Sequence, residues 1–210
     1  PYGLSLDLQE AIRRSRLRHG VVVISLPPRN ALLSEISALT DPNPAPLLAD
    51  ATTDINPTSD AIQNVAAVLA NSKRPIIFAG RGALLADARD DIITLAEQTG
   101  ALLATSLQAR EYFRGHVKNI GLLGTFATEA ASSLLIESDC ILALGVTLNP
   151  KQTGGDRLAP NAKIVQVDRD PARLGALSPI DFGIVGDVRG VVVAVASALK
   201  ALDVEHYDGW

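Results

Sequence analysis

The stretch Pro75-Ile76-Ile77-Phe78-Ala79-Gly80-Arg81-Gly82 decides the fold, because an unbroken apolar run leads directly into a glycine turn. Apolarity without alternating polar residues is typical of a strand that is covered on both faces, as in a parallel sheet. Further runs of strand length share this largely apolar character, and they comprise residues 21–25, 101–105, 140–144, 163–167 and 181–185. Together with the first run, they predict a mostly parallel, six-stranded sheet.

Between the expected strands, apolar residues recur at helical spacing. Such stripes lie within residues 62–69, 88–99 and 188–202, and Asp87 and Asp187 stand as expected N-caps before the last two. A further helix is indicated by a stripe that comprises Phe126, Ala130 and Leu134. Strands that alternate with single helices predict right-handed βαβ units and a doubly wound, Rossmann-like α/β fold with helices on both faces of the sheet.

The first part of the chain differs from the rest. A helix expected over residues 6–17 leads into the run at 21–25, and a proline-rich stretch then extends to Pro57. A structureless loop of that length is unusual inside one compact domain, so it is interpreted as an interdomain linker. The predicted organisation is the end of a preceding domain over residues 1–28, a linker over 29–57 and a central domain over 58–210.

Composition narrows the class of protein. The hydrophobic fraction of 47% and the charged fraction of 20% are those of an ordinary globular chain, and a net charge of −4 gives no indication of nucleic acid as partner. No apolar run is long enough to span a bilayer, so no membrane partner is expected. The single cysteine, Cys140, excludes an internal disulfide and suits a reducing cytoplasm. The sequence has no methionine and begins at Pro1, which indicates a piece of a longer protein.

Ligands of open α/β sheets bind at the carboxyl ends of the strands, where helix N-termini and backbone N–H groups meet. This sequence places glycine, hydroxyl or charged residues after nearly every expected strand. The candidate cofactor-binding residues are Gly80, Arg81, Gly82, Thr105, Ser106, Leu123, Gly124, Thr125, Gly145, Val146, Thr147, Asp168, Arg169, Gly186 and Asp187. Glycines in such places are also expected as simple turn formers, and both interpretations stay open.

Two enzyme classes are disfavoured by the residues. Gly80-Arg81-Gly82 begins like a dinucleotide fingerprint, but Leu85 stands where the third glycine belongs and the next strand ends at Thr105 instead of an acidic residue. A stand-alone NAD enzyme is therefore not expected. His19, His116 and His206 lack metal-ligand spacing, and no nucleophile–base pair is evident. The residues alone indicate a binding or structural domain without catalytic residues of its own.

Short motifs occur in a fixed order along the chain, at residues 73–82, 121–125, 138–145, 162–171 and 184–188. With them, residues 73–202 resemble the central domain of the thiamine-diphosphate-dependent enzymes, the family of acetolactate synthase, pyruvate oxidase, benzoylformate decarboxylase and oxalyl-CoA decarboxylase. The resemblance implies a fold like that of the DHS-like NAD/FAD-binding domains. Residues 19–27 resemble the end of the family's pyrimidine-binding domain, although Arg29 stands in place of the usual aspartate.

The resemblance also implies where the chemistry lies. Thiamine diphosphate and Mg²⁺ would act in the parent enzyme beside a carbonyl of a 2-oxo acid or an acyl-CoA, with protein supplying binding and orientation. The activating glutamate belongs to the pyrimidine-binding domain and the diphosphate motif to a third domain, both outside these residues. Gly154-Gly155-Asp156 lies in a central-domain loop and is not that motif. The flanking domains are the expected partners, in a homo-oligomeric parent.

Some central domains of this family bind FAD or ADP. Flavin-binding members carry an arginine two residues after the glycine that corresponds to Gly145, and Thr147 stands there in this chain. Loss of a guanidinium removes a bidentate phosphate contact, which Lys151 would replace only in part. We therefore expect a structural role between catalytic domains in preference to FAD or ADP binding. A flavin domain resembling the electron-transfer flavoprotein alpha subunit is a further alternative, but it does not predict the strand at residues 21–25.

Overall fold

The computed structural model describes residues 57–155, 159–202 and 210, together with residues 8, 11, 12, 14, 15 and 20–25. The chain divides into two units, Pro1–Thr53 and Asp54–Trp210. In the first unit, Leu8, Ala11, Ile12, Arg14 and Ser15 are helical, in agreement with the helix expected over residues 6–17. The boundaries predicted at residues 28 and 57 adjoin residues outside the described ranges and stay predictions.

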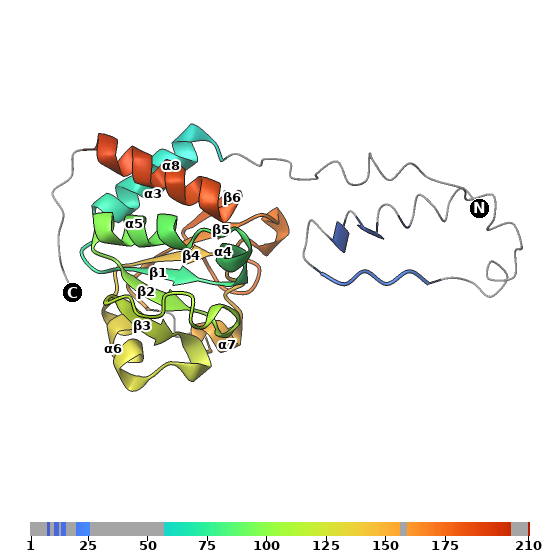
Figure 1. The fold of residues 1–210 in the computed structure, drawn as a ribbon, viewed down its shortest axis with the longest axis horizontal. Helices are drawn as coiled ribbons and strands as arrows, with labels where there is room; N and C mark the ends of the chain where they lie inside the picture. The colour runs from blue at the N-terminus through green and yellow to red at the C-terminus, as the bar shows by residue number, and fades with distance from the viewer. Residues whose placement is uncertain are drawn as a thin grey trace, which may run out of the picture. The chain divides into compact units, whose positions relative to one another are not determined.

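The second unit contains a sheet of six strands that are all parallel (Figure 1). The strands are β1 (Pro75–Ala79), β2 (Leu102–Thr105), β3 (Asn119–Leu122), β4 (Cys140–Leu144), β5 (Lys163–Asp168) and β6 (Phe182–Val185). Their spatial order is β3-β2-β1-β4-β5-β6, which is the strand order of doubly wound nucleotide-binding folds. The predicted fold class is thus confirmed.

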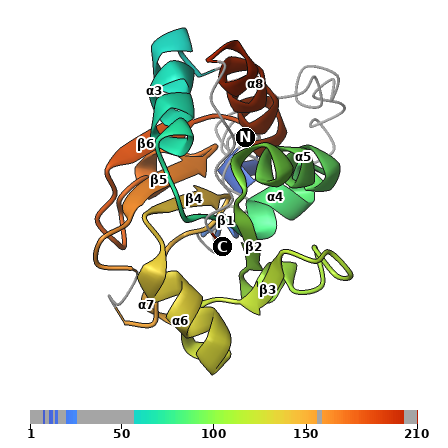
Figure 2. The same cartoon turned by 90° about the vertical axis from the view of Figure 1, so that its left-hand side faces the viewer.

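Helices cover both faces of this sheet (Figures 1 and 2). On one face lie α3 (Ser59–Ala70), α5 (Arg89–Thr99) and α8 (Val188–Ala201), and on the other lie α6 (Glu129–Glu137) and α7 (Pro150–Thr153). The short helix α4 (Arg81–Leu85) follows β1 directly. Two apolar cores result, one built around Ile77 and Leu142 and one around Phe78 and Ile141. Every residue of β1 and β4 is buried, which explains the unbroken apolarity of their sequences.

One expected strand is wrong and another was missed. Residues 21–25 form no strand, and Val21 and Val23 are 93% and 84% exposed. A strand is defined by its hydrogen bonds to a neighbour, and among the described residues none pairs with this segment. The sixth strand is instead β3, an edge strand of half-buried residues that contains Gly121. Such a segment lacks the apolar run by which the inner strands are recognised.

Of the two helix caps expected from the sequence, the one at Asp187 is confirmed and the one at Asp87 is wrong. Thr58 caps α3, and Asp187 caps α8 by accepting the N–H groups of Arg189 and Gly190. The cap expected at Asp87 is wrong, because α5 begins after Ala88 and Asp87 adopts a positive φ of 49°. A turn in the left-handed region places the carboxylate one residue too early to cap the helix.

The buried face of α6 also differs from the expected stripe. Thr128 caps this helix, and its buried residues are Ala131 and Leu135. Phe126 lies before the helix in the 3-10 turn η4 (Gly124–Phe126) and is 58% exposed. The stripe expected at Phe126, Ala130 and Leu134 is therefore out of phase by one residue. Within the described residues, no helix combines the length and apolarity needed to cross a membrane.

Candidate functional site

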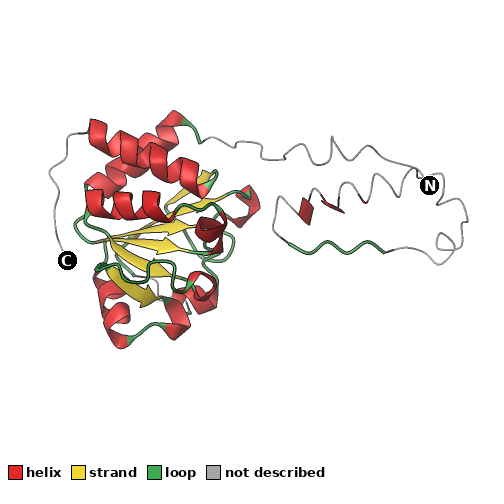
Figure 3. Cartoon of the chain, viewed as in Figure 1, coloured by secondary structure: helices red, strands yellow, loops and turns green. Residues whose placement is uncertain are grey.

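The candidate residues from the sequence lie along one edge of the sheet. Gly80 follows β1, Ser106 follows β2, Leu123 follows β3, Gly145 follows β4 and Gly186 follows β6. Because all strands are parallel, their carboxyl ends share this edge (Figure 3). Within it, β1 and β4 are neighbours whose connections leave toward opposite faces, and such a switch point is where ligands of this fold class bind.

The turns after β1 and β4 are in direct backbone contact at the switch point. The Gly80 N–H donates to the Leu144 carbonyl at 2.9 Å, and the Gly82 N–H donates to the Gly145 carbonyl at 3.2 Å. A Cβ atom added to Gly82 would lie 2.6 Å from the Gly145 Cα, and one added to Gly145 would lie 2.8 Å from the Ala83 nitrogen. These glycines are therefore required for close packing within the chain.

The next strand ends also use their N–H groups internally. Ser106 donates to Ala79, and Leu123 donates to Thr105, at nitrogen–oxygen distances of 2.9 and 3.1 Å. Gly145 donates to Val167 at 2.9 Å, and Gly186 donates to Asp168 at 3.0 Å. Each bond extends the sheet by one residue beyond the strand. These four donors are consequently engaged within the sheet.

Thr147 belongs to the structure that starts α7. Its hydroxyl donates to the Gln152 Oε1 at 2.9 Å and accepts the Asn149 Nδ2–H at 3.1 Å. Asn149 and Gln152 form a reciprocal capping box at this helix. Leu148, which separates Thr147 from Asn149 in the sequence, is buried and has a positive φ of 51°. The position at which the resemblance implied an arginine is thus occupied by a side chain whose donor and acceptor are both used.

The turn after β3 packs on α7 as well. A Cβ added to Gly124 would lie 2.7 Å from the Gln152 carbonyl oxygen, and the Thr125 hydroxyl donates to the Lys151 carbonyl at 3.1 Å. Lys151 itself is exposed. Gly154 ends α7 with a φ of 70°, so the Gly154-Gly155 pair belongs to the turn that terminates this helix.

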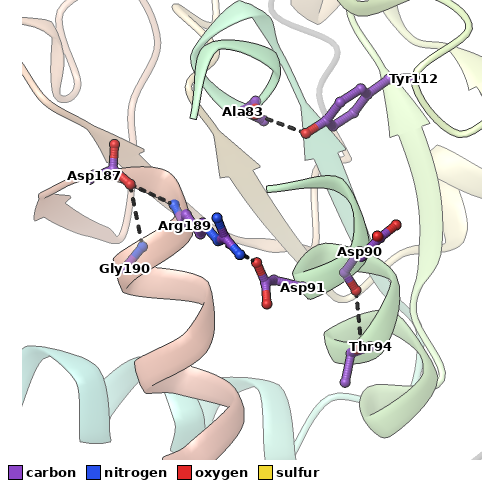
Figure 4. Close-up of polar contacts among 8 residues, drawn as sticks. All are labelled: Ala83, Asp90, Asp91, Thr94, Tyr112, Asp187, Arg189 and Gly190. Carbon is purple, nitrogen blue, oxygen red and sulfur yellow. Dashed lines mark hydrogen bonds and ion pairs between the residues drawn. The ribbon is translucent and has the colours of Figure 1, made fainter. Parts of the chain in front are cut away.

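Acidic and hydroxyl groups at this edge differ in how they are satisfied. Asp168 is 8% exposed and accepts the Asp170 N–H at 2.9 Å, and its burial raises the pKa of its carboxyl group. The Asp187 carboxylate caps α8, whose Arg189 guanidinium bonds to Asp91 of α5 at 2.9 Å (Figure 4). The Ser106 hydroxyl is buried and makes no hydrogen bond within the described structure.

A pocket of about 280 Å³ lies where the loop between β2 and β3 leaves the sheet. Of the candidate residues, it contains Thr105; sequence reasoning missed the rest of its lining. The full lining comprises Thr105, Arg110, Glu111, Phe113, Arg114, Gly115, Asn119, Gly121 and Leu122. The signal available in the sequence was the pair of arginines around Glu111, but without β3 the loop had no place on the sheet.

Metal and nucleophile chemistry find no support among the described residues. There, no three His, Cys, Asp or Glu side chains come together as metal ligands, so these residues do not fit Mg²⁺. His116 Nε2 lies 3.9 Å from Glu97, and its Nδ1 accepts the Lys118 N–H. Cys140 is 1% exposed, and burial raises the pKa of its thiol to about 12. His19 and His206 lie outside the described residues.

Comparisons with known proteins identify the family. The family model described as thiamine pyrophosphate enzyme, central domain, matches residues 62–198. An acetolactate synthase of Mycobacterium leprae is 34% identical over 160 residues, which cover 73% of this chain and 26% of that protein. A sulfoacetaldehyde acetyltransferase of Rhodobacter capsulatus is 32% identical over 206 residues, covering 96% of this chain and 34% of that protein.

The fold has solved relatives too. The benzoylformate decarboxylase structure from Polynucleobacter necessarius superposes with a TM-score of 0.62 at 18% identity, over 73% of this chain and 29% of that one. The chain spans 26% and 34% of the length of the two curated relatives named above. It belongs to the thiamine pyrophosphate-dependent enzyme family, of which it carries the central domain.

Proposed function

We propose that this chain serves as the packing domain between the catalytic domains of a thiamine pyrophosphate-dependent enzyme, without a nucleotide across its strand ends. The observation that carries the proposal is the backbone contact between Gly82 and Gly145. It occupies the switch point at which a dinucleotide would cross from one half of the sheet to the other.

Two further features support a structural role over FAD or ADP binding. The N–H groups of Gly80, Gly145 and Gly186 are hydrogen-bonded within the chain, so they are not available to cradle a phosphate. Thr147 is committed to the capping box of α7 and supplies no guanidinium. The comparisons give no support to a flavin module like that of the electron-transfer flavoprotein alpha subunit.

For the parent protein, we propose cleavage or joining of a bond beside a carbonyl, in a 2-oxo acid or an acyl-CoA. Relatives that bear the names acetolactate synthase and sulfoacetaldehyde acetyltransferase support this class of reaction. Thiamine diphosphate with Mg²⁺ supplies a carbanion-stabilising centre when bound. In this proposal the flanking pyrimidine- and diphosphate-binding domains hold it, in a cytoplasmic homo-oligomer, and residues 58–210 position those domains.

Exposure of the purified chain to FAD and ADP tests the structural role. We expect no flavin absorbance after gel filtration. We also expect no rise in melting temperature with either nucleotide once Arg110 and Arg114 are replaced by alanine, because a ligand that binds only the folded state must raise that temperature. Thr147→Arg and the isosteric Thr147→Val serve as a matched pair. A saturable rise that persists in the folded double variant with Arg110→Ala and Arg114→Ala, or co-purifying flavin, would overturn the proposal and favour the strand-end residues as a nucleotide site.

A further inference from the structure

The loop that connects β2 to β3 is anchored to the body of the domain at its centre. The Tyr112 hydroxyl donates to the Ala83 carbonyl at 2.9 Å (Figure 4), and the Arg89 Nε–H donates to the Tyr112 carbonyl at 2.8 Å. Phe113 is fully buried, with its ring centroid 5.0 Å from that of Tyr112. Two adjacent aromatic side chains therefore fix the position of the loop.

Two arginines flank this aromatic anchor. Arg110 and Arg114 are exposed, and both line the pocket beside β2 and β3. Between them, Glu111 adopts a φ of 72°, a left-handed conformation that is costly for a residue with a side chain. Strain of this kind concentrates at binding sites, where surrounding structure maintains it. The loop thus presents two guanidinium groups from a constrained backbone.

Hydrogen-bond donors outnumber acceptors among the side chains of the pocket. The Asn119 side-chain Oδ1 accepts the Gly121 N–H at 3.0 Å, which leaves the NH₂ group of the same side chain to donate. The Thr105 hydroxyl is 3.5 Å from the Gly121 oxygen, a long and weak bond. With the guanidinium groups of Arg110 and Arg114, the lining offers four donor side chains.

Charge in the pocket runs against that of the whole chain. Its lining contains two arginines and one carboxylate, that of Glu111, which lies 3.2 Å from Arg114. The pocket is therefore net positive in a chain whose net charge is −4. Positive charge, several donors and few acceptors are the features that recognise an oxyanion.

We propose that this pocket binds a phosphate group. Its volume of about 280 Å³ is at the small end for ligand sites and suits a compact anion. The pocket lies beside β2 and β3, whereas the closed switch point lies between β1 and β4, so this site does not depend on the proposed packing role. The same hydrogen-bond donors would recognise free phosphate and the phosphate of a nucleotide. The titration with ADP distinguishes these two ligands.

Thermal unfolding of the chain in sodium phosphate, against sodium chloride of equal ionic strength, tests the site. Matched ionic strength removes the general screening effect of salt. We expect a saturable rise in melting temperature with phosphate, and titration calorimetry gives the affinity. A parallel titration with ADP distinguishes a nucleotide from the free anion, because a nucleotide site shows tighter binding of ADP that still depends on the same arginines.

Variants assign the binding to the pocket. Arg110→Ala and Arg114→Ala each weaken phosphate binding by about 10-fold or more, as expected for loss of a charge-assisted hydrogen bond. Glu111→Gln strengthens it, because the competing carboxylate charge is removed. Lys200→Ala removes one positive charge from the last turn of α8 and leaves the affinity unchanged. Far-ultraviolet circular dichroism verifies that each variant is folded.

Two results would overturn the site. One is a melting temperature in phosphate equal to that in chloride. The other is binding that survives unchanged in the folded double variant with Arg110→Ala and Arg114→Ala. Neither result bears on the packing role, which co-purification of flavin and the FAD and ADP measurements on the folded double variant test separately.

Discussion

The Asp139 carboxylate accepts the backbone N–H of Lys73 at 2.7 Å, and so joins the start of β4 to the segment that enters β1. It also accepts the Arg74 N–H at 3.0 Å and the Ser72 hydroxyl. One acidic side chain thereby satisfies backbone donors that precede a buried strand. This explains why an aspartate stands directly before the apolar run at residues 140–144.

Replacement of Asp139 tests this bracing. Asp139→Ala leaves the N–H groups of Lys73 and Arg74 without their acceptor, and we expect the free energy of unfolding to fall by about 2–3 kcal/mol. Urea denaturation followed by circular dichroism gives the value. Asp60→Ala is the control, because Asp60 is an exposed acid in the first turn of α3 and should cost less than about 1 kcal/mol. Equal losses for the two variants would contradict the bracing role.

Because of the glycine contact at the switch point, two glycine-to-alanine substitutions are expected to change the free energy of unfolding in opposite directions. Gly145→Ala introduces a Cβ at 2.8 Å from the Ala83 nitrogen and at a φ of 61°, so we expect a loss of about 3 kcal/mol or more. Gly190→Ala adds a Cβ with no atom within 4 Å in helix α8, and it should gain about 0.5–1 kcal/mol. Urea midpoints compare them. A Gly145→Ala variant that is as stable as the unaltered chain would contradict a closed switch point.

Cys140 makes thiol labelling a reporter of global unfolding. Burial raises the pKa of this thiol from 9.0 to about 12, so very little of the reactive thiolate forms in the folded chain at about pH 8. We expect Ellman's reagent to react rapidly in guanidinium chloride and with the rate of unfolding in native buffer. A folded-state pKa above the unfolded value also means that this group's contribution to stability is lost as the pH rises from 9.0 toward about 12. Fast labelling of the native chain would show that the strand is accessible.

Asp168 predicts a stability change with pH. Because burial raises its pKa above the unfolded value of 3.8, the protonated form is favoured in the folded state and stability is lost as the pH rises through the folded pKa. Asp168→Asn keeps an acceptor for the Asp170 N–H without the charge, so we expect a higher urea midpoint at neutral pH. The advantage should shrink as the pH falls below the pKa of the folded carboxyl. A difference that is independent of pH would argue against desolvation as its cause.

The inner strands were predictable from the sequence because a strand that is buried on both faces is apolar along its whole length. Residues of β1 and β4 are buried without exception, and both strands read as continuous apolar runs. The edge strand β3 has no continuous apolar run, since its residues are half-buried and one of them is Gly121 at a φ of 86°. Residues 21–25 form an apolar run but have no partner strand among the described residues. An apolar run indicates that a segment can be buried, whereas strand pairing depends on which segments are adjacent in the fold.

The candidate site was predictable only as far as the edge of the sheet. Strand ends place Gly80 and Gly145 correctly, but the sequence left open whether they serve a ligand or a turn. Their actual partner is each other's backbone, which follows from the adjacency of β1 and β4 in space. Arg110 and Arg114 were missed for a related reason, because their pocket exists only once β3 is paired with β2.

The contact between the β1 and β4 turns has a consequence for what the domain needs in order to fold. Bare main chain completes the middle of the sheet there, so no outside molecule is needed to finish the architecture. A domain whose strand ends are closed by its own backbone can keep the same outer surface without a bound nucleotide.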